Sequence, residues 1–472
     1  MRVVSVVGFK LVFGKLRHLP VLITATLLLL PYSVSLAGSV TDDLLRLDQQ
    51  FARLSTEVYR ENNTTPRFSN LNALRQHISR LAAQDNTYAA VRILHANSTL
   101  LETNIYEGIV QYFADILLAE NDLEFLQLLY DAAINDGDPY AVARLSYRLA
   151  QYNYDRYQWQ SALDYLENVH RNLGLPYAHH ALLLGGSSLQ HLKKHRESVK
   201  LYEQIPADSP FYTYARLNIA IAYIRQDWWT DARITINEVL KLQHEEKIPE
   251  IVNRLYLVLG YLLLHKEYYR DAREAFRNIA LDSRYLNRAL LGLGLAAASE
   301  TDFVGALNAL LTLKQKDTGG LEIDESYVLL PYVYEKLNQS MTASAGYNEC
   351  TRHTKEYINA IDTLLHNHPY SKDIEFSPGD QSVLRLGNTA ISVDDKIPAF
   401  LLRNIKNLRL FKRHINSSGL QTKIGALLQQ HLQLYGRIID DELKQRKQYL
   451  QSYMNQCRLG TAKLFDKNEA AN

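Results

Sequence analysis

Cysteine is almost absent from this chain, since only Cys350 and Cys457 occur among its 472 residues. The two stand far apart in the sequence, so no disulfide framework is visible and we expect the fold to depend on helix packing. Glycine and proline are also sparse, with 21 and 12 copies. Because these two residues interrupt helices most strongly, α-helix is the expected structure along most of the chain.

An excess of charge of either sign is missing too. The chain has 52 Lys and Arg against 51 Asp and Glu, which leaves a formal net charge of +1. Proteins that bind nucleic acids through a generally basic surface have a different balance, so we expect no nucleic-acid partner.

Sequence signatures of catalysis are absent as well. No nucleophile elbow, phosphate-binding loop or HExxH helix occurs. Histidines gather near residues 179–195 and 353–368, but no set of Cys or carboxylate residues completes a ligand group around them. We therefore expect no enzyme activity, no cofactor and no metal site.

The N-terminus contains a long stretch without a charged residue, residues 18–41. Residues 19–30 are apolar and follow a positively charged start, and Ser35-Leu36-Ala37 before Gly38 is a sequence that signal peptidase accepts. This pattern predicts a signal peptide over residues 1–37, a mature start at Gly38 and export to the bacterial periplasm. The alternative is an uncleaved inner-membrane anchor over residues 19–41, because no charge occurs between Arg17 and Asp42.

What the sequence does contain is a repeat between residues 140 and 361. Each copy has a small residue, a bulky residue four positions later and usually an aliphatic residue three positions after that. The small residues are 34 to 40 positions apart: Ala162, Ser198, Ala232, Ala272, Ala306 and Ala343. Twelve positions before each one stands a second residue of this set: Ala150, Gly186, Ala220, Gly260, Gly294 or Pro331. Antiparallel helices approach closely where both carry small side chains, so each copy predicts a helical hairpin.

The clearest copy, residues 255–276, resembles the tetratricopeptide repeat, whose period is 34 residues. Gly260, Ala272 and Phe276 match the eighth, twentieth and twenty-fourth positions of that repeat. The match is weaker elsewhere, because Pro331 replaces the usual Gly and only Pro210 matches the terminal proline. The resemblance covers roughly half of the chain. It implies an all-α solenoid of about six tetratricopeptide-like hairpins over residues 140–365.

Other helical segments flank the repeats. Residues 38–139 read as a capping region that opens with an amphipathic helix over residues 42–60. Residues 366–397 contain several Pro and Gly and a short alternation at 383–386, which is typical of a linker or an irregular loop with a small hairpin. Residues 398–466 read as a C-terminal region of two helices, followed by a tail over 467–472.

The second of these helices is long and carries an apolar seam. Its members recur every three or four residues: Leu428, Leu432, Tyr435, Ile439, Leu443, Arg446, Leu450, Tyr453 and Cys457. Such a seam needs a partner, which is either the helix over residues 44–58, a second copy of the chain or another coiled coil. Basic residues precede it without an acid among them, and they suit an anionic membrane, an acidic partner or a solvated face: Arg403, Lys406, Arg409, Lys412, Arg413 and Lys423.

The resemblance also implies a binding surface. In the tetratricopeptide family, the first helix of each repeat lines the concave face. Carried over position by position, the candidate protein-binding residues are Arg144, Tyr147, Tyr154, His180, His191, Tyr214, Arg225, Arg254, Tyr261, His265, Arg288 and Tyr332. Tyr, Arg and His are residue types that anchor interfaces. The Lys and Asn combination that clamps a terminal carboxylate in some family members is missing.

Together these expectations describe an exported scaffold or adaptor that holds envelope proteins or peptides along the concave face of the solenoid. The C-terminal helix would mediate self-association or bind a partner coiled coil, and membrane contact would require an uncleaved N-terminus. The alternative is a non-catalytic accessory or regulatory subunit of an envelope enzyme or export machine, tethered through its C-terminal helices.

Overall fold

The computed structural model describes residues 38–61, 65–84, 86–167, 169, 172–241, 249–316, 319–367, 383–386, 389–392 and 397–471. The predicted signal peptide and most of the 366–397 segment lie outside these ranges. In the described residues, no helix is both long enough and apolar enough to cross a membrane.

Six helices form the N-terminal part of the described chain. They are α2 (Gly38–Arg60), α3 (Leu71–Ala83), α4 (Thr87–Ala96), α5 (Ser98–Glu102), α6 (Gly108–Ala119) and α7 (Leu123–Asp136). The last of them ends at Gly137, whose φ of 81° is the left-handed conformation that glycine adopts easily. The side chain of Asp138 then accepts hydrogen bonds from the backbone N–H groups of Tyr140 and Ala141, which fixes the start of the first repeat.

The predicted repeats form consecutive antiparallel hairpins, which confirms the all-α solenoid. The first helices of the hairpins are α8 (Pro139–Asp155), α10 (Tyr177–His191), α12 (Tyr212–Arg225), α14 (Glu250–His265), α16 (Leu286–Ser299) and α18 (Leu321–Lys336). The second helices are α9 (Trp159–Leu166), α11 (His195–Tyr202), α13 (Trp229–Lys241), α15 (Tyr269–Arg277), α17 (Phe303–Lys314) and α19 (Ser340–Asn367).

Close helix contact at the small residues explains the repeat. A Cβ added to Gly260 would lie 2.5 Å from a ring carbon of Phe276, and one added to Gly186 would lie 2.5 Å from the ring of Tyr202. Only glycine therefore fits at these crossings without a shift of the neighbouring ring. Pro331 does not interrupt α18, which continues through it.

The C-terminal part adds a β-hairpin and two helices. Strands β1 (Val383–Leu386) and β2 (Thr389–Ser392) pair antiparallel, as the alternation at this place predicts. They are followed by α20 (Ala399–His414) and α21 (Ser418–Ala471), a single helix of 54 residues. The long C-terminal helix of the predicted fold is thus present, and it extends into the region expected to be a tail.

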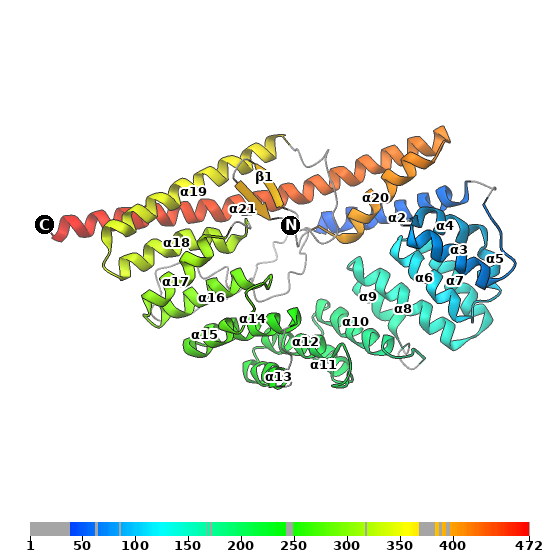
Figure 1. Cartoon of the computed structure of the whole chain (residues 1–472), viewed down its shortest axis with the longest axis horizontal. Helices are drawn as coiled ribbons and strands as arrows, with labels where there is room; N and C mark the ends of the chain where they lie inside the picture. Colours follow the sequence, from blue (N-terminus) through cyan, green and yellow to red (C-terminus); the bar gives the residue numbers. More distant parts are fainter. Residues whose placement is uncertain are drawn as a thin grey trace.

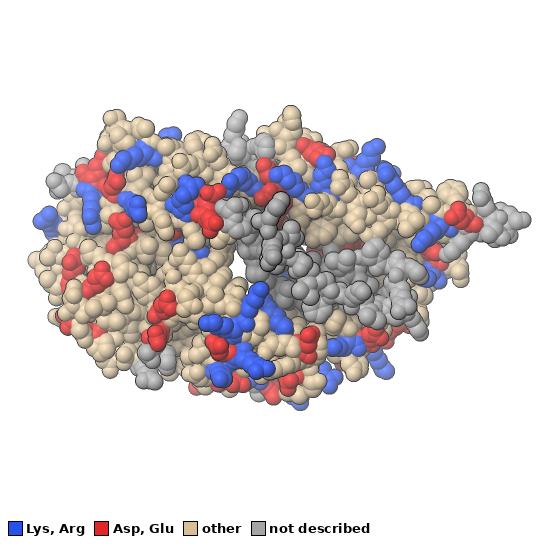
Figure 2. Space-filling model, turned by 180° about the vertical axis from the view of Figure 1, so that it is seen from behind, with Lys and Arg blue, Asp and Glu red and all other residues tan. Residues whose placement is uncertain are grey.

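Helix α21 closes the solenoid into a ring. One half packs along α19 and α18, and the other half packs against α2 and α20. Figure 1 shows the hairpins as an arc that meets α21 directly at its α18–α19 end. At the α8 end the connection to α21 runs through α2 and α20. The opposite face in Figure 2 is hollowed near its centre.

The partner of the apolar seam is therefore the chain itself. Ile439, Leu443 and Leu450 are completely buried. Helix α2, one of the predicted partners, covers only part of the seam, and the solenoid helix α19 covers the rest. Arg446, the charged member of the seam, forms an ion pair with the buried carboxylate of Asp324 in α18. The seam needs no second copy of the chain.

The sequence analysis saw no disulfide framework, and the structure corrects this interpretation. Cys350 in α19 and Cys457 in α21 are joined by a disulfide, with their Cα atoms 6.3 Å apart. The two residues are 107 positions apart in the sequence and become neighbours only because α21 runs back along α19. Nothing in the local sequence around either cysteine carries this information.

Candidate functional site

The predicted binding residues lie on the first helices of the hairpins. In Figure 1, α12, α14 and α16 lie on the side of the arc that faces α21, whereas α11, α13 and α15 lie on the outer side. Tyr214, in the first turn of α12, is 46% exposed and offers an aromatic surface on this inner row. Arg144, Arg225 and Arg254 are half-buried there.

Two predicted contact residues are instead part of the core. Tyr261 is 2% exposed, its ring packs edge-on against Phe276, and its hydroxyl donates a hydrogen bond to the carbonyl oxygen of Arg288 at 2.8 Å. Burial raises the pKa of Tyr261 well above its usual value. Tyr147 is 5% exposed, and its hydroxyl lies 2.7 Å from Nδ1 of His180. The close packing of successive first helices covers both tyrosines, so they offer little surface to a partner in this structure.

Several other candidates are engaged within the chain. The guanidinium of Arg288 donates to Glu322 at 3.0 Å, and that of Arg144 donates to the carbonyl oxygen of Tyr106 at 3.2 Å. The ammonium of Lys336 lies 5.3 Å from the ring centre of Tyr332. The first contact joins α16 to α18, the second joins α8 to the N-terminal region, and the third lies within α18. Each leaves less of the side chain for a partner.

Three further candidates, Tyr154, His191 and Arg225, lie near two residues that were not candidates, Trp159 and His195. We call these five residues the Arg225 cluster. The imidazole of His191 stacks on the indole of Trp159, with ring centres 3.9 Å apart and planes 6° apart. The ring of Tyr154 meets both of them edge-on. Its hydroxyl is 2.7 Å from Oγ of Ser187, which fixes the orientation of the ring.

The electrostatics of the cluster keep its histidines neutral. Burial, followed by the nearby charge of Arg225, lowers the pKa of His191 to about 4. Burial, followed by Arg225 and Lys193, also lowers the pKa of His195. Burial lowers the pKa of Arg225 itself, although a guanidinium remains charged at neutral pH. The cluster therefore offers one cation and two uncharged imidazoles.

A related arrangement follows in the next hairpins. His265, at the end of α14, lies with its ring centre 4.8 Å from that of Trp229, and the ammonium of Lys266 lies 4.4 Å from the same indole. Burial lowers the pKa of His265, as does Lys266, whereas Asp227 raises it.

The sequence analysis missed Trp159, His195 and Trp229, because it considered first helices only. These residues open the second helices, each three positions before the small residue of its repeat. That constant offset was a usable signal. At these junctions the last residue of a first helix contacts the first residue of the second helix of the preceding hairpin. His191 of α10 meets Trp159 of α9 in this way, and His265 of α14 meets Trp229 of α13.

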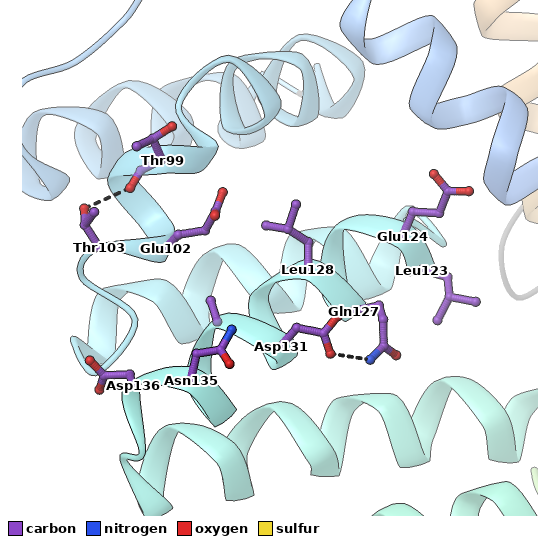
Figure 3. Close-up of a pocket in the computed structure, with 11 residues that line it drawn as sticks. Thr99, Glu102, Thr103, Leu123, Glu124, Gln127, Leu128, Asp131, Asn135 and Asp136 are labelled. Atoms are coloured by element: carbon purple, nitrogen blue, oxygen red, sulfur yellow. Dashed lines mark hydrogen bonds between the residues drawn. The ribbon is translucent and has the colours of Figure 1, made fainter.

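An open cleft of about 830 Å³ lies elsewhere, between α5 and α7. Figure 3 shows Glu102 on one side and Asp131 and Glu124 on the other, with Asp131 accepting a hydrogen bond from Gln127 at 3.0 Å. Within the described part of the chain, no group of three His, Cys, Asp or Glu residues is arranged to hold a metal ion. The lining of the cleft is acidic, with four carboxylate residues.

The basic residues before the seam are divided between internal contacts and solvent. Lys423 pairs with Glu57 of α2 at 2.7 Å, and Arg403 donates to the side chain of Asn121 at 3.3 Å. Lys406, Lys412 and Arg413 are exposed.

Neither a protein-family model nor a curated protein sequence matches this chain. Three solved structures share part of its helical arrangement. The C-terminal part of a tetratricopeptide-repeat-containing protein from Cytophaga hutchinsonii is 14% identical, with a TM-score of 0.43 over 51% of this chain and 93% of that one. A tetratricopeptide repeat protein from Parabacteroides merdae is 11% identical, with a TM-score of 0.31 over 59% and 91%. The apo form of the quorum sensor NprR from B. thuringiensis is 14% identical, with a TM-score of 0.34 over 81% and 98%. These values are too low to transfer a function.

Proposed function

We propose that this protein is an exported, non-catalytic scaffold that binds a polypeptide along the inner face of its ring. The observation that carries the proposal is the Arg225 cluster, where aromatic rings and a cation without an acidic partner among the described residues meet near the turns of successive hairpins. Aromatic and Arg side chains dominate the energy of protein interfaces, because they bury large areas and offer directed hydrogen bonds.

Export is supported by the disulfide between Cys350 and Cys457. Disulfides persist in oxidising compartments and are rare in the cytosol. The N-terminal charge and apolar pattern has the same implication. Protein isolated from cells without reductant should begin at Gly38 and have no free thiol. Recovery of residue Met1 in an integral membrane fraction would favour the inner-membrane anchor instead, and reduced cysteines would argue against export.

A second candidate function has its own observation. Leu459 and Phe465, near the end of α21, are 55% and 63% exposed. Figure 1 shows this end of the helix running past α19 towards the C-terminus. Exposed apolar side chains at a projecting helix end support an accessory subunit that is tethered to an envelope enzyme or export machine through α21.

Site-specific photocrosslinking in living cells tests both functions. A photoreactive residue would replace Tyr214 on the inner row, Ile234 on α13, or Leu459 on α21, three side chains that are all about half exposed. A specific crosslinked protein from position 214 supports the scaffold, and one from position 459 alone supports the tethered subunit. The outer position 234 is the matched control. Crosslinks from 234 alone would contradict both proposals.

A further inference from the structure

Arg225 has no acidic partner in the described structure, although it is half-buried. Its guanidinium forms no ion pair or hydrogen bond with any described carboxylate, and the groups in its electrostatic environment are His191, His195 and the hydroxyl of Tyr202. Two arginines in the following hairpins, by contrast, have acidic partners. Arg273 is bound by Glu300 and Asp302, both at 2.7 Å, and Arg288 is bound by Glu322.

A second group in the cluster is also unsatisfied. Nδ1 of His195 is buried and has no hydrogen-bond partner within the described residues. Buried polar groups are usually paired, and partly buried charges are usually compensated. An uncompensated cation and an unsatisfied imidazole nitrogen at the same junction therefore indicate a missing ligand that is negatively charged and forms hydrogen bonds.

The aromatic residues around the cluster limit the chemical class of the ligand further. Trp159 and Tyr154 lie on one side of it, and Trp229 with His265 lies at the following junction, where Nδ1 of His265 is also buried without a partner. A free inorganic ion would use none of these rings. Packed helices are about 8 to 10 Å apart, and an extended peptide rises about 3.3 Å per residue. One peptide of a few residues can therefore contact consecutive junctions.

We propose that Arg225, His191 and His195 bind the side-chain carboxylate of an Asp or Glu in an extended peptide, whose neighbouring residues pack on Trp159 and Trp229. This inference rests on the proposed scaffold function and names the chemistry of its partner. The guanidinium supplies charge and two parallel donors for a carboxylate. The neutral imidazoles supply hydrogen bonds without adding charge that would attract anions indiscriminately.

Fluorescence anisotropy with defined peptides tests the inference on the full mature chain. The probe is a labelled peptide of about twelve residues that repeats Ala-Trp-Glu, long enough to span three junctions, with both termini blocked. Its partner probe repeats Ala-Trp-Gln. We expect the Glu peptide to bind at least about tenfold more tightly than the Gln peptide. We also expect Arg225→Gln to remove that preference. Arg233→Gln, an exposed position on the outer helix α13, removes the same charge and should leave the preference intact.

Equal affinity for the two peptides, or an Arg225→Gln variant that still prefers Glu, overturns the inference. A third peptide with a free C-terminal carboxylate and no Glu separates the two sources of a carboxylate, and tighter binding of this peptide overturns the side-chain assignment. Absence of all peptide binding, together with a specific crosslink from position 214, would refute the inference and leave the scaffold function standing. Circular dichroism of each variant verifies that it is folded.

Discussion

Asp48 shows how much of this structure depends on one buried carboxylate. It is 4% exposed in α2 and accepts hydrogen bonds from Arg156 at 2.5 and 3.2 Å, from the hydroxyl of Tyr152 at 2.7 Å and from the amide of Asn404 at 2.9 Å. Arg156 also stacks over the ring of Tyr152 at 3.3 Å. One side chain thus connects the first described helix, the first repeat and α20.

Replacement of Asp48 by Ala should strongly destabilise the fold. Arg156 is 2% exposed and would be left with an uncompensated buried charge. We expect a loss of about 3 to 5 kcal/mol in the free energy of unfolding, measured by urea denaturation. The control is Asp441→Ala, where a 59% exposed carboxylate pairs with the equally exposed Lys444, and this change should cost less than about 1 kcal/mol. Similar losses for both variants would contradict the role assigned to Asp48.

His191 predicts a pH dependence of stability. Its pKa is lowered from 6.5 to about 4 in the folded chain, so the unfolded chain binds the proton more readily. Stability from this group is therefore complete above about pH 6.5 and declines as the pH falls towards 4, by roughly 2 kcal/mol for a partly exposed group. Replacement by Phe keeps the stack on Trp159 and should remove this decline, measured as the difference in unfolding free energy between pH 7 and pH 4.5. The exposed His366→Phe serves as the control. An unchanged decline in His191→Phe would assign the acid sensitivity to other groups.

At the scale of the element, the close approach of two helices limits the size of the side chain that fits where they cross. Gly260→Ala should destabilise the chain, because the added Cβ would meet the ring of Phe276 at 2.5 Å, and overpacking of this kind costs about 1 to 3 kcal/mol. Gly425→Ala should instead stabilise it by about 0.5 to 1 kcal/mol, because this glycine lies within α21 with nothing within 4 Å of the new Cβ. Thermal unfolding measures both changes. Equal effects would show that the register of the hairpins is wrong.

The elements were predictable where the information is local. The recurrence of Ala232, Ala272 and Ala306 fixed the hairpins, because close helix contact imposes the same small residue at the same offset. The ring was not predictable in this way. The apolar seam on α21 indicated that a partner helix exists. Many apolar helix faces could cover such a seam, and its pairing with α19 depends on packing between segments that are distant in the sequence. The same reason hid the bond between Cys350 and Cys457.

The candidate site was predicted in part. Its first-helix members, His191 and Arg225, follow from the family positions. The same positions also gave Tyr261, which is buried, because they do not distinguish an inward-facing side chain from one covered by the next hairpin. Trp159 and His195 were missed because they belong to the second helices.

At the scale of the whole molecule, the ring predicts a monomer. Sedimentation velocity of the mature chain should give a single species of monomer mass, because the seam is already covered. A chain that ends at Ser417 lacks α21 and exposes the apolar faces of α2 and α19, so it should self-associate. Loss of helix α21 exposes many apolar side chains, each worth roughly 1.5 to 3 kcal/mol. A dimer of the mature chain, or a soluble monomer after truncation, would contradict the internal pairing.

The pairing of α2 with α21 also determines the order in which the molecule can be completed. A ribosome makes α2 long before α21, so the apolar side of α2 has no partner until nearly the whole of the described chain has been synthesised. The hairpins can form one after another from local contacts, but the final joint depends on residues that are distant in sequence, which slows folding. During that interval the exposed apolar side of α2 makes the chain prone to aggregation. A chaperone that covers α2 until α21 has been synthesised should therefore raise the yield of folded protein more than a chaperone that binds the hairpins.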